Sequence, residues 1–180
     1  MQFIQTPILG LCVIEPKVFE DPRGYFYESY NQTAFGIHHI NAEFVQDNQS
    51  LSQKNVLRGL HFQNPPYAQG KLVRVITGSV LDVVVDIRKK SATYGQHFSI
   101  VLDEKNKTML WIPPGFAHGF LTLQDHTIFS YKCTNLYNKA SEDALLWNDP
   151  DLAIDWGTTT PLLSEKDKEA NFFKNLKSLF

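Results

Sequence analysis

VLRGLHFQ at residues 56–63 and QGKLVRV at residues 69–75 predict two apolar strands, joined by a loop that contains Pro65 and Pro66. A histidine, a lysine and an arginine interrupt this apolar sequence, and burying such groups is costly unless they are paired or used. Taken alone, His61 could be a hydrogen-bonded core histidine, with the cations reaching outward to water. Because three such groups fall within fourteen residues, we infer that a functional site lies here.

The composition is that of an ordinary globular chain of 180 residues, and we expect a single domain spanning 1–180. Thirteen Phe, seven Tyr and three Trp favour a β-rich core. A net charge of −2 gives no general affinity for nucleic acid, and neither a secretory signal nor a membrane span is recognisable. Cys12 and Cys133 show no metal-ligand spacing, so we interpret them as free thiols of a cytoplasmic protein, with a disulfide as the alternative.

Other short strands are expected along the chain, separated by turn signals. They lie at residues 11–14, 25–30, 44–48, 80–87, 97–102, 109–112, 116–123 and 128–134. The last two are predicted to form a hairpin, and residues 31–43 a short helix or loop. Alternation puts Phe44, Gln46 and Asn48 on one face, where the amides suit either a planar ligand or solvent. Alternation also separates Asp82 and Asp86 from the apolar face of residues 80–87.

The C-terminal segment changes character from about residue 160. Ser164 can cap a helix that begins with Glu165 and Asp167, because its oxygen can accept the free N–H groups of the first turn. Apolar side chains follow at helical spacing, which predicts an amphipathic helix packed on the body or on a partner. They are Phe172, Phe173, Leu176, Leu179 and Phe180. The fold class is therefore all-β, a jelly-roll barrel of antiparallel strands with short C-terminal helices.

Two motifs resemble those of cupin barrels. PGFAH at residues 114–118 is similar to the second cupin motif, and GLHFQ at residues 59–63 stands where the first would lie. A metal-binding cupin usually offers two histidines two residues apart and then a glutamate. Here Gln63 replaces the second histidine and Lys71 stands in the region of the carboxylate, which leaves His61 and His118. The resemblance is thus to a metal-free cupin.

A finer resemblance covers nearly the whole chain in order. Its motifs are PKVF at 16–19 with Arg23-Gly24, FVQDN at 44–48, RGLHFQ at 58–63, QGKLVRV at 69–75, VDIR at 85–88, LWIPPGFAHGF at 110–120, YKCT at 131–134 and LSEKD at 163–167. Together they resemble the dTDP-4-dehydrorhamnose 3,5-epimerase family. The resemblance implies inversion of the carbons that flank the 4-keto group of a dTDP-linked deoxyhexose, as in a rhamnose-type pathway. The carbonyl acidifies those positions, so no redox cofactor and no metal is expected.

The same resemblance implies a role for each catalytic residue. His61 is expected to be the base, with Asp167 holding its other ring nitrogen, although Asp167 is equally a typical first-turn helix residue. Lys71 is expected to face the oxygen that becomes an enolate. Tyr131 is expected to protonate the opposite face of the sugar. The alternative is that Tyr131 is an aromatic side chain of the core without a catalytic role.

Substrate binding is implied for a second group of residues. Arg58 and Arg23 are expected to hold the diphosphate, because guanidinium groups fit phosphate oxygens bidentately. The positions expected around the nucleoside are Phe19, Glu28, Gln46 and Asn48, and His118 is expected to bond the sugar. In the family some of these residues come from the partner subunit, which implies a homodimer.

Two details depart from the simplest pattern. Strand alternation puts Arg58 and His61 on opposite faces, and a bulge at Gly59 would bring both inward. Where the family often has two successive tyrosines, this chain has Leu136 and Tyr137, a departure that bears on preference for the base.

Three other functions remain as alternatives. The first is a mono-epimerase or 3,4-ketoisomerase for a related nucleotide sugar, and the second is a non-catalytic nucleotide-sugar sensor. A sensor is expected to lose His61 or Tyr131, and both are present. A metal-dependent cupin oxygenase is a distant third.

Overall fold

The computed structural model describes all residues, 1–180, and is dominated by antiparallel strands. The strands are β1 (Gln2–Gln5), β2 (Cys12–Glu15), β3 (Phe19–Asp21), β4 (Gly24–Phe26), β5 (Gln46–Ser52), β6 (Leu57–Gln63), β7 (Lys71–Thr77), β8 (Ser79–Asp86), β9 (His97–Asp103), β10 (Met109–Ile112), β11 (Phe116–Thr122), β12 (Thr127–Cys133) and β13 (Glu142–Ala144). The helices are α1 (Gln32–Ile37), α2 (Glu165–Lys168) and the 3₁₀ turn η1 (Phe173–Asn175). None of them is long and apolar enough to cross a membrane.

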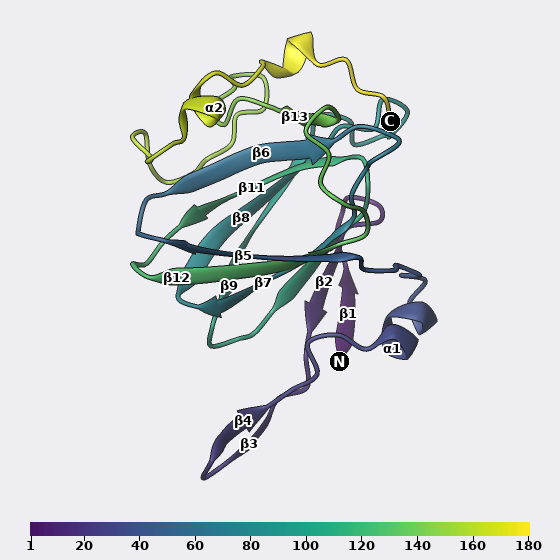
Figure 1. Ribbon diagram of the computed structural model, residues 1–180, viewed down its shortest axis with the longest axis vertical. Coiled ribbons are helices and arrows are strands. Elements are labelled where there is room, and N and C mark those ends of the chain that lie inside the picture. The colour runs from purple at the N-terminus through teal and green to yellow at the C-terminus, as the bar shows by residue number, and fades with distance from the viewer.

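Two sheets face each other and enclose the core (Figure 1). One has the order β1-β2-β10-β7-β12-β5, and the other β13-β6-β11-β8-β9. Buried side chains of both sheets form the cluster between them, including Val73, Leu110 and Phe129 from the first and Val84 and Phe120 from the second. From β5 to β12 the chain crosses repeatedly between the sheets, as in a jelly roll, which confirms the predicted fold class.

The predicted hairpin of residues 116–123 and 128–134 is wrong. Both strands exist, but β11 pairs with β6 and β8, whereas β12 pairs with β5 and β7. Alternation is a local property that identifies a strand, while the choice of neighbours depends on the whole topology. The crossing matters for function, because it places His118 on one sheet and Tyr131 on the facing one.

The C-terminal segment covers the outer face of the five-stranded sheet (Figure 1). Phe173, Leu176 and Phe180 pack there, so the expected packing on the body is confirmed. The continuous amphipathic helix is wrong, since only α2 and η1 are helical. Hydrogen bonds to other parts of the chain replace helical ones. For example, the Phe173 N–H donates to the Asp149 carboxylate (2.5 Å). The tail therefore follows the sheet surface in an irregular path.

The N-terminal region departs from the expected strand at residues 25–30, of which only Tyr25 and Phe26 belong to β4. The hairpin of β3 and β4 projects away from both sheets (Figure 1). Helix α1 instead packs on the outer face of the six-stranded sheet through the buried Phe35. Phe44 joins this α1 cluster and precedes β5, so it does not share the environment predicted for it beside Gln46.

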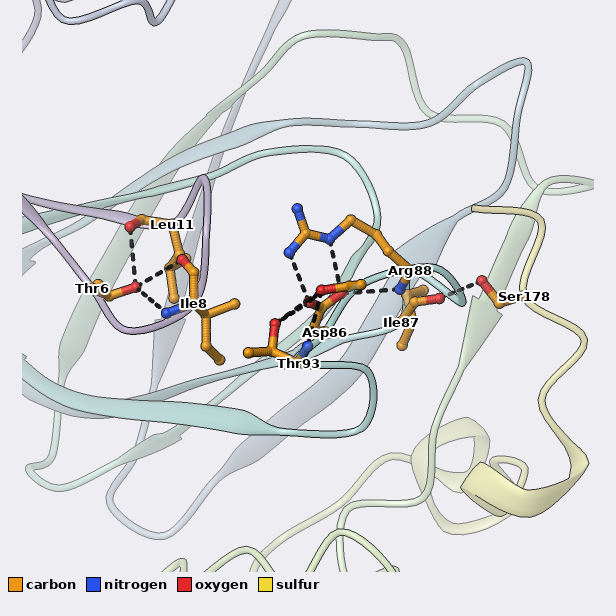
Figure 2. A network of polar contacts seen from close by, with 9 residues as sticks. Thr6, Ile8, Leu11, Asp86, Ile87, Arg88, Thr93 and Ser178 are labelled. Carbon is orange, nitrogen blue, oxygen red and sulfur yellow. Dashed lines mark hydrogen bonds and ion pairs between the residues drawn. The ribbon is translucent and has the colours of Figure 1, made fainter.

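Hydrogen bonds around Asp86, at the end of β8, hold the loop that follows this strand (Figure 2). The carboxylate is fully buried and accepts hydrogen bonds from the Arg88 side chain (2.8 and 2.7 Å), Ser91 (2.6 Å) and Thr93 (2.6 Å). Burial alone would raise the pKa of Asp86, but these bonds lower it to about 2. This carboxylate thus stabilises the fold as an anion, with every oxygen satisfied.

Candidate active site

A cavity of about 570 Å³ is lined by residues of both sheets and of the C-terminal segment 162–167. Seven of the eleven predicted site residues line it: Asn48, Arg58, His61, Lys71, His118, Tyr131 and Asp167. The fold brings them together from distant parts of the sequence, since His61 and Asp167 are 106 residues apart.

Both Arg58 and His61 of β6 reach this cavity, although strict alternation would separate them. In the pairing with β11, His61 lies opposite His118 and Arg58 lies opposite Phe120. Three steps along β6 therefore match two along β11, which is the signature of a bulge. Gly59 lies inside it with a φ of +134°, where glycine is favoured. The predicted bulge at Gly59 is confirmed.

His61 and Asp167 form a hydrogen-bonded dyad, with 2.5 Å between His61 Nε2 and Asp167 Oδ1. The backbone N–H of Asp167 donates to Ser164 Oγ (3.1 Å), so the predicted N-cap is confirmed and fixes the carboxylate. Burial would raise the pKa of Asp167, but the hydrogen bond and charge of His61 outweigh it and the pKa is lowered. An ionised carboxylate only accepts, so Nε2 carries the proton of the neutral imidazole, in which Nδ1 keeps a lone pair.

Tyr131 and Lys71 approach from the facing sheet, with Lys71 Nζ 6.0 Å from the centre of the Tyr131 ring. Burial raises the pKa of Tyr131, which keeps its phenol protonated at neutral pH. Burial lowers the pKa of Lys71, while negative charge at Cys133, Asp82 and Glu142 acts in the opposite direction. Burial also raises the pKa of Cys133, so this group is a neutral thiol at pH 7. Asp82 and Glu142 are therefore the groups whose negative charge favours the ammonium form of Lys71.

A smaller cavity of about 210 Å³ adjoins the first and shares Asn48, His61, Lys71 and Tyr131 with it. Gln46 and Asn48 line it, and Gln46 Nε2 donates to Asn48 Oδ1 (3.1 Å). Both amide side chains therefore lie beside the predicted catalytic residues, and their contact with a nucleoside stays a prediction.

Tyr137 and Glu142 complete this wall; Glu142 was not identified from the sequence, and Tyr137 was noted only for its place after Leu136. The Tyr137 hydroxyl donates to Glu142 (2.9 Å), which also pairs with Lys166 (2.5 Å). No local pattern singles out Glu142, because it is brought in by the pairing of β13 with β6. Leu136 is 57% exposed and lines neither cavity, so the replaced tyrosine position does not form this wall.

Arg58 and His118 border the main cavity differently. Arg58 is an exposed residue, and its Nε donates to Ser52 Oγ (3.2 Å), which leaves the two terminal nitrogens of the guanidinium free for an anion. His118 is buried, and its Nε2 lies 2.9 Å from Asp82 Oδ2. The sequence marked Asp82 only as a carboxylate inside an apolar strand.

The structure does not bring Phe19, Arg23 and Glu28 to the cavity. Phe19 and Arg23 lie on the projecting hairpin, where Arg23 pairs with Asp21 (2.5 Å) and Phe19 is 53% exposed. Glu28 is exposed and accepts a hydrogen bond from Asn31 at the start of α1 (3.1 Å). These three residues are accessible to another molecule and do not reach the main cavity of their own subunit.

Comparison with known proteins assigns this arrangement to a family. A sequence model of dTDP-4-dehydrorhamnose 3,5-epimerases matches residues 5–175. The chain is 53% identical over 172 residues to the dTDP-4-dehydrorhamnose 3,5-epimerase of Escherichia coli, covering 93% of this chain and 92% of that one.

Two solved structures share the fold. The dTDP-6-deoxy-D-glucose-3,5-epimerase of Legionella pneumophila, in complex with dTDP-4-keto-L-rhamnose, has a TM-score of 0.93 at 47% identity, covering 97% of this chain and 94% of that one. A 3'-monoepimerase of Streptomyces bikiniensis, in complex with dTDP-quinovose, has a TM-score of 0.88 at 31% identity, covering 94% and 86%. With the motifs in register and the dyad, lysine and tyrosine around one cavity, this chain belongs to the dTDP-4-dehydrorhamnose 3,5-epimerase family.

Proposed function

We propose that this protein inverts carbons 3 and 5 of a dTDP-4-keto-6-deoxyhexose, without a cofactor, by proton abstraction and reprotonation. The observation that carries the proposal is the position of His61 and Tyr131, which border one cavity from opposite sheets with Lys71 beside Tyr131. A sugar ring between them would present one face to the base and the other to the acid. This arrangement is what inversion requires.

The proton balance follows from the side chains. His61 Nδ1 takes the proton from the carbon next to the keto group, and Asp167 stabilises the resulting imidazolium. The electron pair moves to the carbonyl oxygen, where the Lys71 ammonium stabilises the enolate; one such donor is worth roughly 10²–10³ in rate. Tyr131 gives its phenol proton to the other face of the same carbon. Exchange with water then restores both groups for the second carbon.

Incubation with dTDP-4-keto-6-deoxyglucose in heavy water, followed by NMR of the sugar, tests this assignment. The wild type is expected to incorporate deuterium at both carbons and invert both. His61→Asn should abolish exchange, because no base remains. Tyr131→Phe should retain exchange on the original face, while product formation falls by about 10²–10⁴. Equal loss of exchange and inversion in Tyr131→Phe would mean that Tyr131 is needed to form the enolate.

The same experiment separates the alternatives. Deuterium and inversion at only one carbon would identify a mono-epimerase, and movement of the keto group would identify a 3,4-ketoisomerase. Binding of dTDP-sugar without exchange would identify a sensor. Stoichiometric iron in the purified protein would instead favour an oxygenase. The relatives that match at 46–53% identity and are named 3,5-epimerases favour the double inversion.

The diphosphate and nucleoside are proposed to lie between Arg58 of one subunit and Phe19, Arg23 and Glu28 of its homodimer partner. The exposed position of these three residues on the N-terminal arm, residues 19–28, supports this arrangement. A location in the cytoplasm is also proposed. Support for it comes from Cys12 and Cys133, which are buried free thiols as predicted.

Subunit complementation tests the shared site. Arg23→Ala and His61→Asn each impair every site of their own homodimer. Mixed before refolding, they form heterodimers in which one site has both native residues, so about a quarter of the wild-type sites should recover. No recovery from a mixture that sediments as dimers would place Arg23 in the same subunit as its His61 or outside the site. A fully active monomer would contradict the dimer.

A further inference from the structure

Two aspartates lie fully buried on the inward face of β8, and only one of them is satisfied. Asp86 uses both carboxylate oxygens, as described above. Asp82 Oδ2 contacts His118 Nε2 (2.9 Å), whereas Asp82 Oδ1 is enclosed without any hydrogen-bond partner. A buried polar atom without a partner costs stability, so Asp82 is poorly explained by a stabilising role.

The geometry of His118 indicates what Asp82 does. Carboxylate oxygens are hydrogen-bond acceptors, so the contact with Asp82 Oδ2 is satisfied when the proton of His118 is on Nε2. In the neutral imidazole Nδ1 then keeps its lone pair, and it makes no hydrogen bond within the protein. His118 lines the cavity beside His61, its register partner on the neighbouring strand. The imidazole lies beside the stacked pair of Phe120 and Phe129, with its centre 6.5 Å and 6.1 Å from their ring centres. His118 therefore presents a fixed acceptor to the substrate.

We propose that Asp82 is a positioning residue for the epimerisation: it holds His118 with its proton on Nε2, so that Nδ1 accepts a hydrogen bond from a hydroxyl of the sugar. His118 and Asp82 thus form a second His–Asp dyad beside that of His61 and Asp167. The negative charge of Asp82 also favours the ammonium form of Lys71, which faces the reacting oxygen. This inference rests on the proposed function, because it assigns the hydroxyl to the sugar in the same cavity.

The first measurement is the tautomer of His118 in the free wild-type protein, by ¹⁵N NMR of the imidazole nitrogens, assigned with His118→Gln. A proton on Nε2 is expected, and a proton on Nδ1 overturns the proposal without any variant. This readout does not depend on turnover. If the wild type fails to epimerise the keto sugar, the proposed function fails while the tautomer of His118 is still decided.

The second measurement compares Asp82→Asn with a matched control, Asp86→Asn, on the same strand face. Asp82→Asn loses the charge and can turn its amide toward Nε2, so the Nε2 proton should no longer be fixed. We expect kcat to fall about 10- to 100-fold, the range for losing one hydrogen bond to a charged group, while dTDP affinity stays within about twofold. Asp86→Asn should lower the melting temperature but leave the His118 tautomer and kcat unchanged.

Two results would overturn the proposal. One is an Asp82→Asn protein with an unchanged tautomer and kcat. The other is a loss of kcat that follows the melting temperature equally in Asp82→Asn and Asp86→Asn, which would give Asp82 a structural role only. If Asp82→Asn does not fold, the wild-type tautomer remains the deciding measurement.

Discussion

Replacing Gly59 by alanine should damage both stability and catalysis, because the backbones of β6 and β11 approach closely at this glycine. A Cβ atom at Gly59 would lie 2.4 Å from Gly119 Cα and 2.9 Å from the carbonyl oxygen of His118. Both obstacles are backbone atoms of the neighbouring strand, which cannot rotate away as a side chain could. The strands must therefore separate, and His61 and Arg58 move with β6.

The expected loss of stability in Gly59→Ala has two sources. A φ of +134° strains any residue with a Cβ by about 1–3 kcal/mol, and overpacking adds about 1–3 kcal/mol. For a chain of this size, the sum corresponds to a fall in melting temperature of roughly 4–24 °C. A displacement of about 1 Å at a catalytic group can cost roughly 10² in rate. We therefore expect Gly59→Ala to lose about that factor in kcat under conditions where it remains folded.

Gly157→Ala is the matched control, since Gly157 also has a positive φ, +70°, but a Cβ there would meet no atom within 4 Å. It tests backbone strain without the steric conflict. The assay combines thermal unfolding with epimerisation rates measured well below both melting temperatures. If Gly59→Ala matches Gly157→Ala in both quantities, the approach of the two strands does not hold the site together.

Three further predictions concern individual charges. Arg58→Ala should weaken dTDP binding at least about tenfold in calorimetry, since a hydrogen bond to a charged group is worth about 1.5–3 kcal/mol; unchanged affinity would remove Arg58 from the phosphate site. Asp167→Asn should lower kcat by about 10²–10⁴ while KM changes little, and a normal kcat would show that His61 needs no carboxylate. The lowered pKa of Asp86, about 2, should add about 2 kcal/mol of stability above pH 4 that is lost as the pH falls toward 2. Urea unfolding should show a shallower acid dependence in Asp86→Asn, and an equal slope would contradict this.

Local patterns predicted most of the strands and the centre of the site. Alternation and turn residues are properties of short segments, so the positions of β6, β7 and β8 could be read directly. The conflict in parity between Arg58 and His61 even located the bulge, because both side chains were needed inside. The partnership of β12 with β5 and β7 could not be predicted, since it depends on contacts between segments far apart in the chain.

The sequence also could not predict the roles of residues whose partners lie far away in the chain. Asp82 was visible as a carboxylate in an apolar strand, but His118, its partner, is 36 residues away. Glu142 carries no local signal, and its position follows from the short β13 strand. The C-terminal segment misled in another way. Its helical spacing correctly predicted that apolar residues of this segment pack on the sheet. The spacing did not predict the backbone conformation, because tertiary hydrogen bonds to Asp149 and Ile87 hold the segment in a non-helical path.

The N-terminal hairpin carries residues whose role neither the sequence nor the structure of a single chain explains without a second subunit. Tyr25 is 57% exposed and Phe26 66% exposed on strands of only three residues each. An isolated two-stranded hairpin is marginally stable in water, and exposed aromatics gain little until another surface covers them. Phe19 and Arg23 were assigned to the substrate by their motif, yet neither lines the cavity that holds His61 in their own subunit. Both facts have the same physical solution if the hairpin docks on the proposed partner: the aromatics become buried, and a cation reaches a diphosphate that Arg58 alone would hold from one side.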